Sequence, residues 1–585
     1  MSAAGFIGRV GGLALALGVG AAAFNGAAVA WADSSGSGGS SAHAGSARSA
    51  SGDSTSAGGP AKHTAPGAVA ASGRSRPTST VRAQSTVGTL TKVASTPAAA
   101  AEPSEPETPA VPAESPLELA ALAYSRRDTG VSARPAAAAS LVPEASVQAL
   151  AAQNTALIMG PSGVPIPSPT YIQDVFNLYV APNSPAGTVP FQLDTPEGLY
   201  PITGVKSLPL NVSVDQGLQI LAAAIAEQVA AGNTATVFGY SQSAIISSLI
   251  MSQLPADTPV EFVLVGNEMN PNGGLLSRFP GLQLPSLGLN FYGATPENLF
   301  PTTNYTQEYD GFADFPRYPL NILSVLNAGL GIIFVHTKYA DLTQEQVDSA
   351  IALPTTSATQ HYYIIPTQNL PLLEPLRLLP VIGTPLADLL QPALKVIVNL
   401  GYGDPQYGWS NEGFANQQTT FGIIPDVNWG EVANLFFAGV EQGIKDFVAD
   451  VSPGGVMWQE LASLKLPEPS SLAPPPTPAS IITALQTVIT DTALFISNAA
   501  ASLYAALLPT ADIVNAIVTV LPAYDATLFL DGIQQAISGD VINGLINAIG
   551  LPIAANAGLV TTAALIEVLV LLQAVEGFFG QQTNV

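Results

Sequence analysis

Two kinds of apolar pattern alternate along residues 150–450. Residues 215–233 and 242–254 carry apolar side chains at helical spacing, and the first stretch ends in Gly-Asn, a helix stop signal. Short apolar runs bounded by turn residues predict buried strands at 154–160, 234–241 and 259–267, and further strand-like runs lie at 302–310, 331–336 and 361–367. Strands that alternate with helices predict an α/β domain over residues 150–450, with a mostly parallel sheet covered by helices on both faces.

The chain outside this domain has a different texture. Residues 1–32 hold one arginine, an apolar run and small residues around Trp31, which predicts a secretory signal peptide; an uncleaved anchor helix is the competing interpretation. Residues 33–149 are rich in Ser, Gly, Ala, Thr and Pro, a low-complexity composition that predicts a disordered spacer. Residues 451–480 include a proline-rich stretch and predict a linker.

Residues 481–585 predict an apolar helical C-terminal region. Its most apolar stretch, 557–575, is long enough to cross a bilayer but contains Glu567, which a membrane interior disfavours. The pattern therefore favours a helical bundle or a module that associates with a membrane or envelope surface over a true membrane span.

Composition narrows the function. The sequence has 18 Lys and Arg against 42 Asp and Glu, a net charge of −24, so we expect no nucleic-acid partner. Cysteine is absent, which excludes disulfides, thiolate nucleophiles and cysteine-held metals. We find no zinc-binding helix motif, no phosphate-binding loop with lysine and no carboxylate set at metal spacing, so no metal or cofactor is expected. An uncharged or lipidic substrate fits this composition.

The stretch VFGYSQSA places Ser241 between a predicted strand and a predicted helix. A serine nucleophile on such an elbow has its hydroxyl pushed into solvent, and the residues two before and two after it must be small. Gly239 and Ser243 occupy these positions, which gives G-x-S-x-S in place of G-x-S-x-G. In the alternative interpretation, Ser241 or Ser243 only caps the helix. The backbone N–H of Gln242 and the loop 160–163 are the candidate oxyanion donors.

A serine nucleophile needs a base and an acid, in the order Ser, acid, His for this kind of fold. Only two of the four histidines lie outside the low-complexity spacer, and both follow Ser241. His336, at the end of an apolar run, is preferred as the base over His361, which begins a predicted strand. For the acid, Asp310 follows a predicted strand directly and is preferred, while Asp314 remains an alternative.

Several motifs in order resemble the PE-PPE domain, an exported mycobacterial module similar to cutinases and other serine α/β-hydrolases. They are LIMGPSGVPIPSPTYI, FGYSQSA, VLVGNEMNPNGGLLSRF, EYDGFADFPRYPLNILSVLNAGLGIIFVHTKYADL and PLRLLPVIGTPLADLLQPALKVIVNLGYGDP. The resemblance implies a Ser-Asp-His esterase or acyltransferase acting on lipid esters of the cell envelope, with Ser241 as nucleophile and Asp310 and His336 as its partners.

Two departures from the family pattern bear on this resemblance. Pro161 replaces a glycine expected in the oxyanion loop and has no N–H, which leaves Ser162 or Gly163 as the second donor. The start of the sequence shows a signal and a low-complexity spacer instead of a PE or PPE helical domain, so the resemblance does not extend to the pairing partners of such domains.

We therefore expect a secreted or envelope-associated serine esterase or lipase that uses an acyl-enzyme and takes a lipid or fatty-acyl ester as substrate. An acyltransferase that moves acyl chains onto a trehalose-type glycolipid is the first alternative. A non-catalytic envelope protein with a hydrolase-like fold is the second, because a fold does not establish a reaction. The Gly- and Pro-rich segment 268–300 is expected as a lid, a lipid-contacting loop or an ordinary surface crossover.

Overall fold

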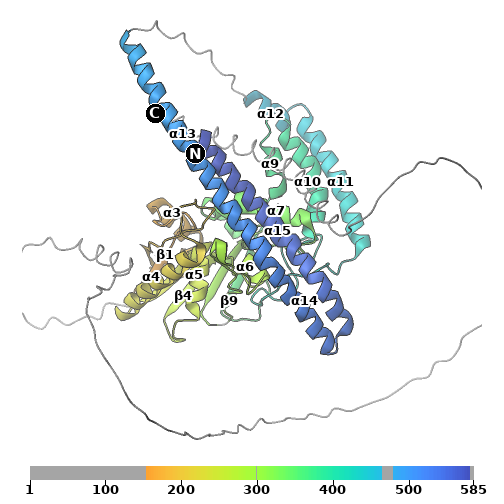
Figure 1. Ribbon diagram of the computed structural model, residues 1–585. Helices are drawn as coiled ribbons and strands as arrows, with labels where there is room; N and C mark the ends of the chain where they lie inside the picture. Colours follow the sequence, from red (N-terminus) through yellow and green to blue (C-terminus); the bar gives the residue numbers. More distant parts are fainter. Residues whose placement is uncertain (1–152, 298, 464–477, 580–585) are drawn as a thin grey trace, which may run out of the picture. The chain divides into compact units, whose positions relative to one another are not determined.

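The structure is a computed structural model that describes residues 153–297, 299–463 and 478–579 (Figure 1). The expected signal peptide and nearly all of the sequence up to the first strand lie outside the described residues. Within the expected linker, Val456–Ser463 form helix α12, and the proline-rich residues 464–477 lie outside the described residues.

A seven-stranded sheet forms the centre of the domain, in the order β2-β1-β3-β4-β7-β9-β8. Every neighbouring pair is parallel except β8 and β9, which are antiparallel at one edge. This confirms the predicted mostly parallel α/β architecture. The strands are β1 (Asn154–Ile158), β2 (Val189–Gln192), β3 (Thr234–Tyr240), β4 (Val260–Val265), β7 (Thr302–Gln307), β8 (Ile351–Ala352) and β9 (Gln360–Ile365), and β5 (Gln283–Leu284) and β6 (Leu289–Asn290) form a separate hairpin.

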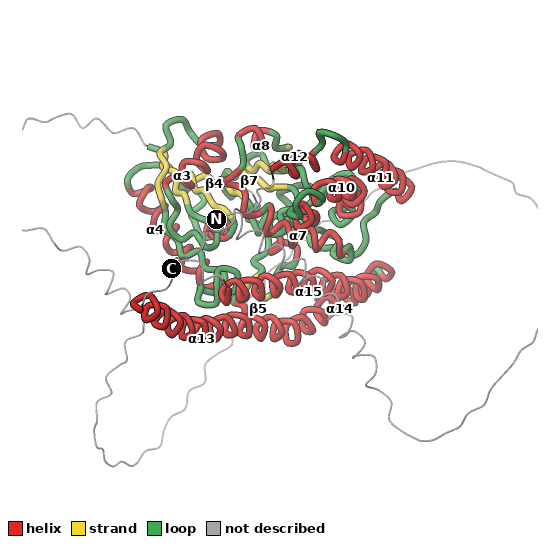
Figure 2. The backbone as a smooth tube through the Cα atoms, turned by 90° about the horizontal axis from the view of Figure 1, so that it is seen from above, coloured by secondary structure: helices red, strands yellow, loops and turns green. Residues whose placement is uncertain are grey.

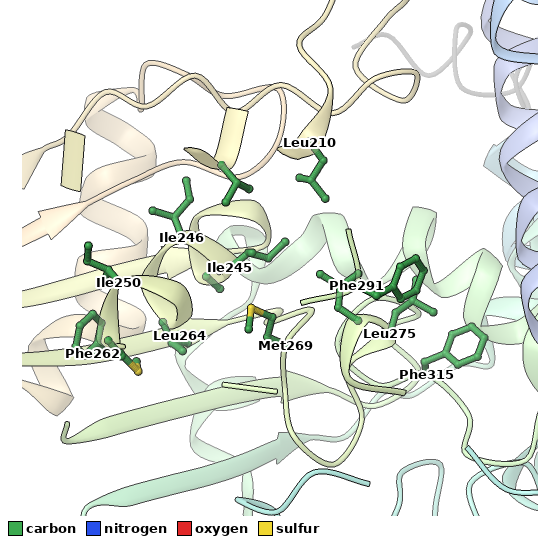
Figure 3. Close-up of a cluster of buried hydrophobic side chains, with 14 of the residues drawn as sticks. Leu210, Ile245, Ile246, Ile250, Phe262, Leu264, Met269, Leu275, Phe291 and Phe315 are labelled. Carbon is green, nitrogen blue, oxygen red and sulfur yellow. The ribbon is translucent and has the colours of Figure 1, made fainter. Parts of the chain in front are cut away.

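Successive residues of the central strands point to opposite faces and join two different core clusters. Leu157 and Leu264 belong to the cluster beneath α4 (Leu210–Ala230) and α5 (Gln242–Met251), shown in Figure 3. Ile158 and Val265 belong to the cluster on the other face. The remaining helical segments are α3 (Pro169–Val175), η1 (Phe176–Val180), η2 (Ala181–Asn183), α6 (Leu275–Arg278), η3 (Pro285–Leu287), α7 (Ile322–Phe334), η4 (His336–Asp341), α8 (Gln344–Asp348), η5 (Pro371–Leu373), α9 (Glu374–Arg377), α10 (Gly383–Asn399) and α11 (Trp429–Val451).

The strand predicted at residues 331–336 is wrong, because this segment ends helix α7. Asn321 caps the helix by accepting a hydrogen bond from the Ser324 N–H, and nearly all residues from Ser324 to Gly331 are buried. A short apolar run has the same appearance in a buried strand and in a buried helix, so the run alone did not separate them. His336 consequently follows a helix end rather than a strand end.

The C-terminal residues form long helices that pack on the α/β domain. Helix α13 (Pro478–Asn515) continues through η6 (Ala516–Val520) into α14 (Leu521–Ile537), and α15 (Val541–Phe579) returns beside them (Figure 2). Leu521 and Leu559 belong to the same core cluster as the strand residues. Two stretches, Gln486–Ile537 and Val541–Gly577, are long and apolar enough to cross a membrane, by length and composition alone.

Candidate active site

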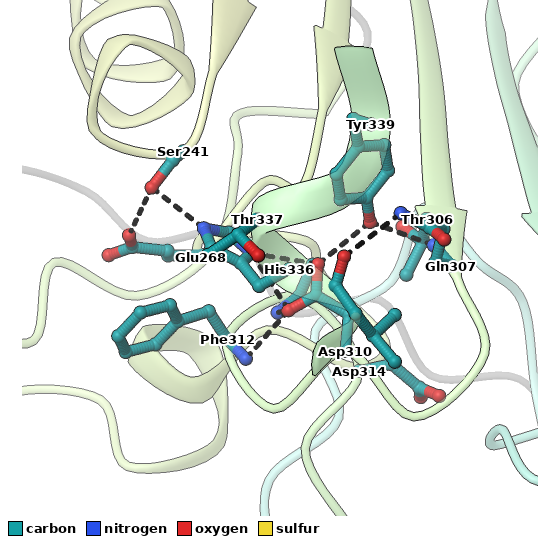
Figure 4. A network of polar contacts seen from close by, with 12 residues as sticks. Ser241, Glu268, Thr306, Gln307, Asp310, Phe312, Asp314, His336, Thr337 and Tyr339 are labelled. Atoms are coloured by element: carbon teal, nitrogen blue, oxygen red, sulfur yellow. Dashed lines mark hydrogen bonds and ion pairs between the residues drawn. The ribbon is translucent and has the colours of Figure 1, made fainter. Parts of the chain in front are cut away.

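The residues expected to carry the chemistry meet near the carboxyl ends of three neighbouring strands. Ser241 follows β3 directly, Glu268 lies in the loop after β4, and Asp310 follows β7. This is the edge at which open parallel sheets build their sites, because the loops from adjacent strands converge there. His336 reaches the same place from the end of α7 (Figure 4).

The Ser241 backbone adopts φ 57° and ψ −122°, a left-handed conformation that L-residues rarely take. Gly239 is required at this turn, because an added Cβ would lie 2.6 Å from the Ser243 carbonyl oxygen. The unusual Ser243 is accommodated because its hydroxyl accepts from the Tyr240 N–H at 2.8 Å and donates to the Tyr240 carbonyl oxygen at 3.0 Å. Ser243 therefore braces the elbow, and Ser241 stands at its tip.

A continuous chain of hydrogen bonds joins Ser241, His336 and Asp310. Ser241 Oγ lies 2.8 Å from His336 Nε2, and His336 Nδ1 lies 2.8 Å from Asp310 Oδ2 and 2.9 Å from Oδ1. With Nδ1 facing a carboxylate, the neutral imidazole carries its proton on Nδ1 and presents a bare Nε2 to the hydroxyl. This tautomer is the one that accepts a proton from serine.

Several donors fix the Asp310 carboxylate. The N–H groups of Phe312 and Ala313 donate to Oδ1 at 2.9 and 3.2 Å, and the Tyr339 hydroxyl donates to Oδ2 at 2.7 Å. Tyr339 in turn accepts from the Gln307 N–H at 2.8 Å, so it is held to the end of β7. The carboxylate is thereby held in a position that orients the imidazole.

Asp314 and His361, the alternative acid and base, do not contact Ser241 in the structure. Asp314 Oδ2 accepts from the Tyr309 N–H at 3.0 Å, and burial raises the pKa of Asp314 well above its ordinary value. His361 is exposed near the amino end of β9, whereas the Ser241 site lies at the carboxyl end of the sheet.

Burial and the neighbouring carboxylate act in opposite directions on His336. Removal from water disfavours the charged imidazolium, but the charge and hydrogen bond of Asp310 outweigh it, and the pKa of His336 is raised above its ordinary value. The Tyr240 hydroxyl donates to the His336 backbone carbonyl, and the Phe312 ring packs edge-on against the imidazole with the centroids 4.9 Å apart. These contacts hold the ring in place.

A second carboxyl group reaches the nucleophile. Glu268 Oε1 lies 3.2 Å from Ser241 Oγ, and Figure 4 shows this contact beside the contact to His336. Burial raises the pKa of Glu268 to about 7, although the nearby His336 lowers it in part. The single Ser241 proton thus has two acceptors within reach whenever Glu268 is ionised.

The expected exposure of the Ser241 hydroxyl is wrong, because the residue is only 2% exposed. Glu268 and His336 contact its oxygen from two sides. Other parts of the same chain therefore cover the hydroxyl that the turn would otherwise expose to solvent.

Of the three expected oxyanion residues, Gln242 and Ser162 lie together. Gln242 Nε2 donates to Ser162 Oγ at 2.9 Å and to the Gly198 carbonyl oxygen at 2.8 Å, which ties the elbow to the loop after β1. Gln242 is the first residue of α5, where a backbone N–H has no partner within the helix. The Gly163 N–H already donates to the Glu197 carbonyl oxygen at 2.7 Å, so in this arrangement it does not face an oxyanion.

Three residues that position the site were missed from the sequence. Glu268 and Tyr339 carried one weak signal, since both are polar residues just beyond apolar runs that end at this edge. Gly266 carried none: it has φ 56°, and an added Cβ would lie 2.9 Å from the Tyr339 ring and 3.1 Å from His336 Cε1. A side chain at that position would push the imidazole out of line.

Known proteins share this part of the chain. The PE-PPE domain model matches residues 186–403. The uncharacterized PPE family protein PPE28 of Mycobacterium tuberculosis is 49% identical over 449 residues, which cover 73% of this chain and 67% of that protein. The chain belongs to the PE-PPE domain family. The family expected from the sequence motifs is confirmed.

Two further relatives from Mycobacterium tuberculosis have named activities. The protein named esterase PE16 is 46% identical over 281 residues, 46% of this chain and 51% of the relative. The protein named diacyltrehalose acyltransferase Chp2 is 26% identical over 192 residues, 30% of this chain and 52% of the relative. The chain therefore spans about half the length of each of these two proteins.

Proposed function

We propose that this chain is an exported serine esterase or lipase that cleaves carboxylic esters of lipids through Ser241, His336 and Asp310. The hydrogen-bonded chain from Ser241 Oγ through the imidazole to Asp310 carries the proposal. The similarity to the relative named esterase PE16 supports the coarser assignment, a serine hydrolase of the esterase type.

In the first half-reaction, His336 Nε2 takes the Ser241 proton while Oγ forms a bond to the ester carbonyl carbon. The carbonyl oxygen becomes an oxyanion, which the backbone N–H of Gln242 and a donor from Ser162 stabilise. Asp310 stabilises the imidazolium that results. The imidazolium then gives its proton to the leaving alcohol, and the acyl group remains on Ser241.

In the second half-reaction, a hydroxyl group attacks the acyl carbon while His336 takes its proton; the bond between the acyl group and Ser241 Oγ then breaks, and the imidazolium returns a proton to Oγ. Water as the attacking group makes the protein an esterase, and a sugar hydroxyl makes it an acyltransferase. The burial of Ser241 supports the acyltransferase as an alternative, because an acyl-enzyme shielded from water survives until another alcohol binds. Transfer onto a trehalose-type glycolipid is thus the alternative function, and the similarity to Chp2 supports it.

The outer surface of the C-terminal helices is suited to contact with a lipid surface. Val518, Ile542 and Ile549 are 62%, 74% and 65% exposed, and each lies on a helix that packs on the α/β domain through other residues. Exposed apolar side chains in such number mark a surface that contacts lipid or protein. Together with the expected signal peptide at residues 1–32, they support a location in or at the cell envelope.

The proposed function is tested by labelling the purified protein with a fluorophosphonate and mapping the modified residue. We expect one labelled site, Ser241, since a phosphonate forms a stable bond only with an activated serine. p-Nitrophenyl esters, with and without trehalose, then distinguish hydrolysis from transfer. A protein that is folded but neither labelled nor active on any ester would leave the non-catalytic alternative.

Glu268 predicts a shift in the pH dependence of the reaction. Its charge helps to raise the pKa of His336, and an imidazolium accepts no proton, so activity falls as the pH drops through that pKa. Glu268→Gln removes the charge and keeps the shape. We expect the acidic limb of the profile of kcat/KM against pH to move to lower pH.

Glu197→Gln is the matched control for this experiment. Glu197 is also a buried carboxyl, and burial raises its pKa to about 8, but its Oε1 accepts from Thr195 Oγ1 at 2.6 Å rather than from Ser241. We expect its acidic limb to stay where it is in the unmodified protein. An unchanged limb in Glu268→Gln would show that Glu268 does not act on the imidazole.

A further inference from the structure

An apolar cavity of about 100 Å³ lies next to residues that contact the nucleophile and the base, although Ser241 and His336 do not line it themselves. Glu268, which contacts Ser241 Oγ, and Phe312, which packs against the His336 imidazole, both line it. The rest of the lining is almost entirely aliphatic and aromatic carbon. Glu268 thus contacts both the Ser241 hydroxyl and this apolar space, and an acyl group on Ser241 that passed Glu268 would meet it.

The C-terminal helices form one wall of this cavity. Ile513, Ala516 and Ile517 line it from α13 and η6, and Leu559, Ala563 and Ile566 line it from α15. The opposite wall consists largely of leucines in the segment 275–289, part of the stretch expected as a lid, a lipid-contacting loop or a surface crossover. The cavity thus depends on a part of the chain that follows the segment 186–403 matched by the family model.

Polar contacts fasten α13 to the rim of the cavity. The Tyr200 hydroxyl donates to Asp512 Oδ2 at 2.6 Å, and Ser286 Oγ donates to the Asp512 carbonyl oxygen at 2.8 Å. Tyr200 itself lines the cavity, and Ile513 follows Asp512 directly. These bonds fix the register in which the helix presents its inner face.

We propose that the C-terminal helices complete an acyl-chain pocket, and that Ile517 and Ala563 determine which acyl chain lengths the site accepts. The inference rests on the proposed esterase function, since it places the acyl group of a Ser241 ester in the cavity. Each methylene group buried in such a pocket changes affinity about fourfold, so the depth of the wall translates into selectivity. Acyl selection and bond cleavage then reside in different segments of the chain.

The test compares kcat/KM on p-nitrophenyl esters from acetate to palmitate for variants that deepen or fill the pocket. Ile517→Ala removes three carbon atoms from the wall, and we expect the ratio of decanoate to butyrate hydrolysis to rise about tenfold. Ala563→Leu adds three carbon atoms, and we expect the same ratio to fall by a similar factor. Opposite shifts from two helices are not expected from a general loss of stability.

Val518→Ala is the matched control, because Val518 neighbours Ile517 on the same helix but is 62% exposed. Its chain-length profile is expected to equal that of the unmodified protein. Thermal unfolding and fluorophosphonate labelling show whether each variant is folded with its nucleophile intact. If the unmodified protein cleaves esters and both pocket variants keep its profile, the acyl-pocket inference is overturned while the esterase function stands. If no ester is cleaved and Ser241 is not labelled, the esterase function itself fails.

Discussion

Ser241→Ala is expected to lower kcat on a p-nitrophenyl ester by about 10⁴-fold or more. The variant keeps Gln242 and the apolar cavity but lacks the oxygen that forms the acyl-enzyme. KM is therefore expected to change far less than kcat. The measurement is steady-state hydrolysis, with fluorophosphonate labelling beside it.

Ser243→Ala is the control that separates the two serines of the G-x-S-x-S motif. Its hydroxyl bonds to the Tyr240 backbone, so its loss leaves a buried N–H without that partner and costs about 1–3 kcal/mol of stability. We expect kcat to stay within about tenfold of the unmodified protein, since Ser243 bonds to neither His336 nor Asp310. Retained turnover in a folded Ser241→Ala variant would end the assignment of Ser241 as nucleophile.

The sequence identified Ser241 and Asp310 because each stands at the end of a predicted strand. Ser241 follows an apolar run and precedes a helical pattern, and Asp310 ends a strand-like run, so a parallel sheet brings both to one edge. The scarcity of histidine narrowed the choice of the base, since only His336 and His361 lie outside the low-complexity residues. The ends of the predicted strands and the small number of histidines were therefore sufficient to select Ser241, Asp310 and His336.

The sequence did not show what depends on packing between distant segments. The apolar residues before His336 fit a strand as well as the helix they form, and only the sheet order, with β9 beside β7, decides between them. The burial of Ser241 depends on side chains from other loops, which a motif does not reveal. The inner face of α15 was equally hidden, because a helix that is apolar on most sides does not indicate which face is covered.

The choice between Asp310 and Asp314 predicts the second large effect. Asp310→Asn is expected to lower kcat/KM by about 10³- to 10⁴-fold. An uncharged amide neither stabilises the imidazolium nor ensures that the proton stays on Nδ1, so Nε2 is no longer reliably free to accept the Ser241 proton. The pKa of His336 is expected to fall as well, since the charge and hydrogen bond of Asp310 are the main causes of its rise, and the acidic limb of the pH profile is expected to move to lower pH.

Asp314→Asn is the matched control, four residues along the same loop. Burial raises the pKa of Asp314 well above its ordinary value, and an amide resembles the neutral form of this carboxyl. Its contact is with the Tyr309 N–H, which the amide oxygen of asparagine also accepts. We expect less than a tenfold loss of kcat/KM and unchanged labelling of Ser241. A larger loss in Asp314→Asn than in Asp310→Asn, with both variants folded, would mean that the imidazole is oriented by a carboxylate other than the one that faces it in this structure.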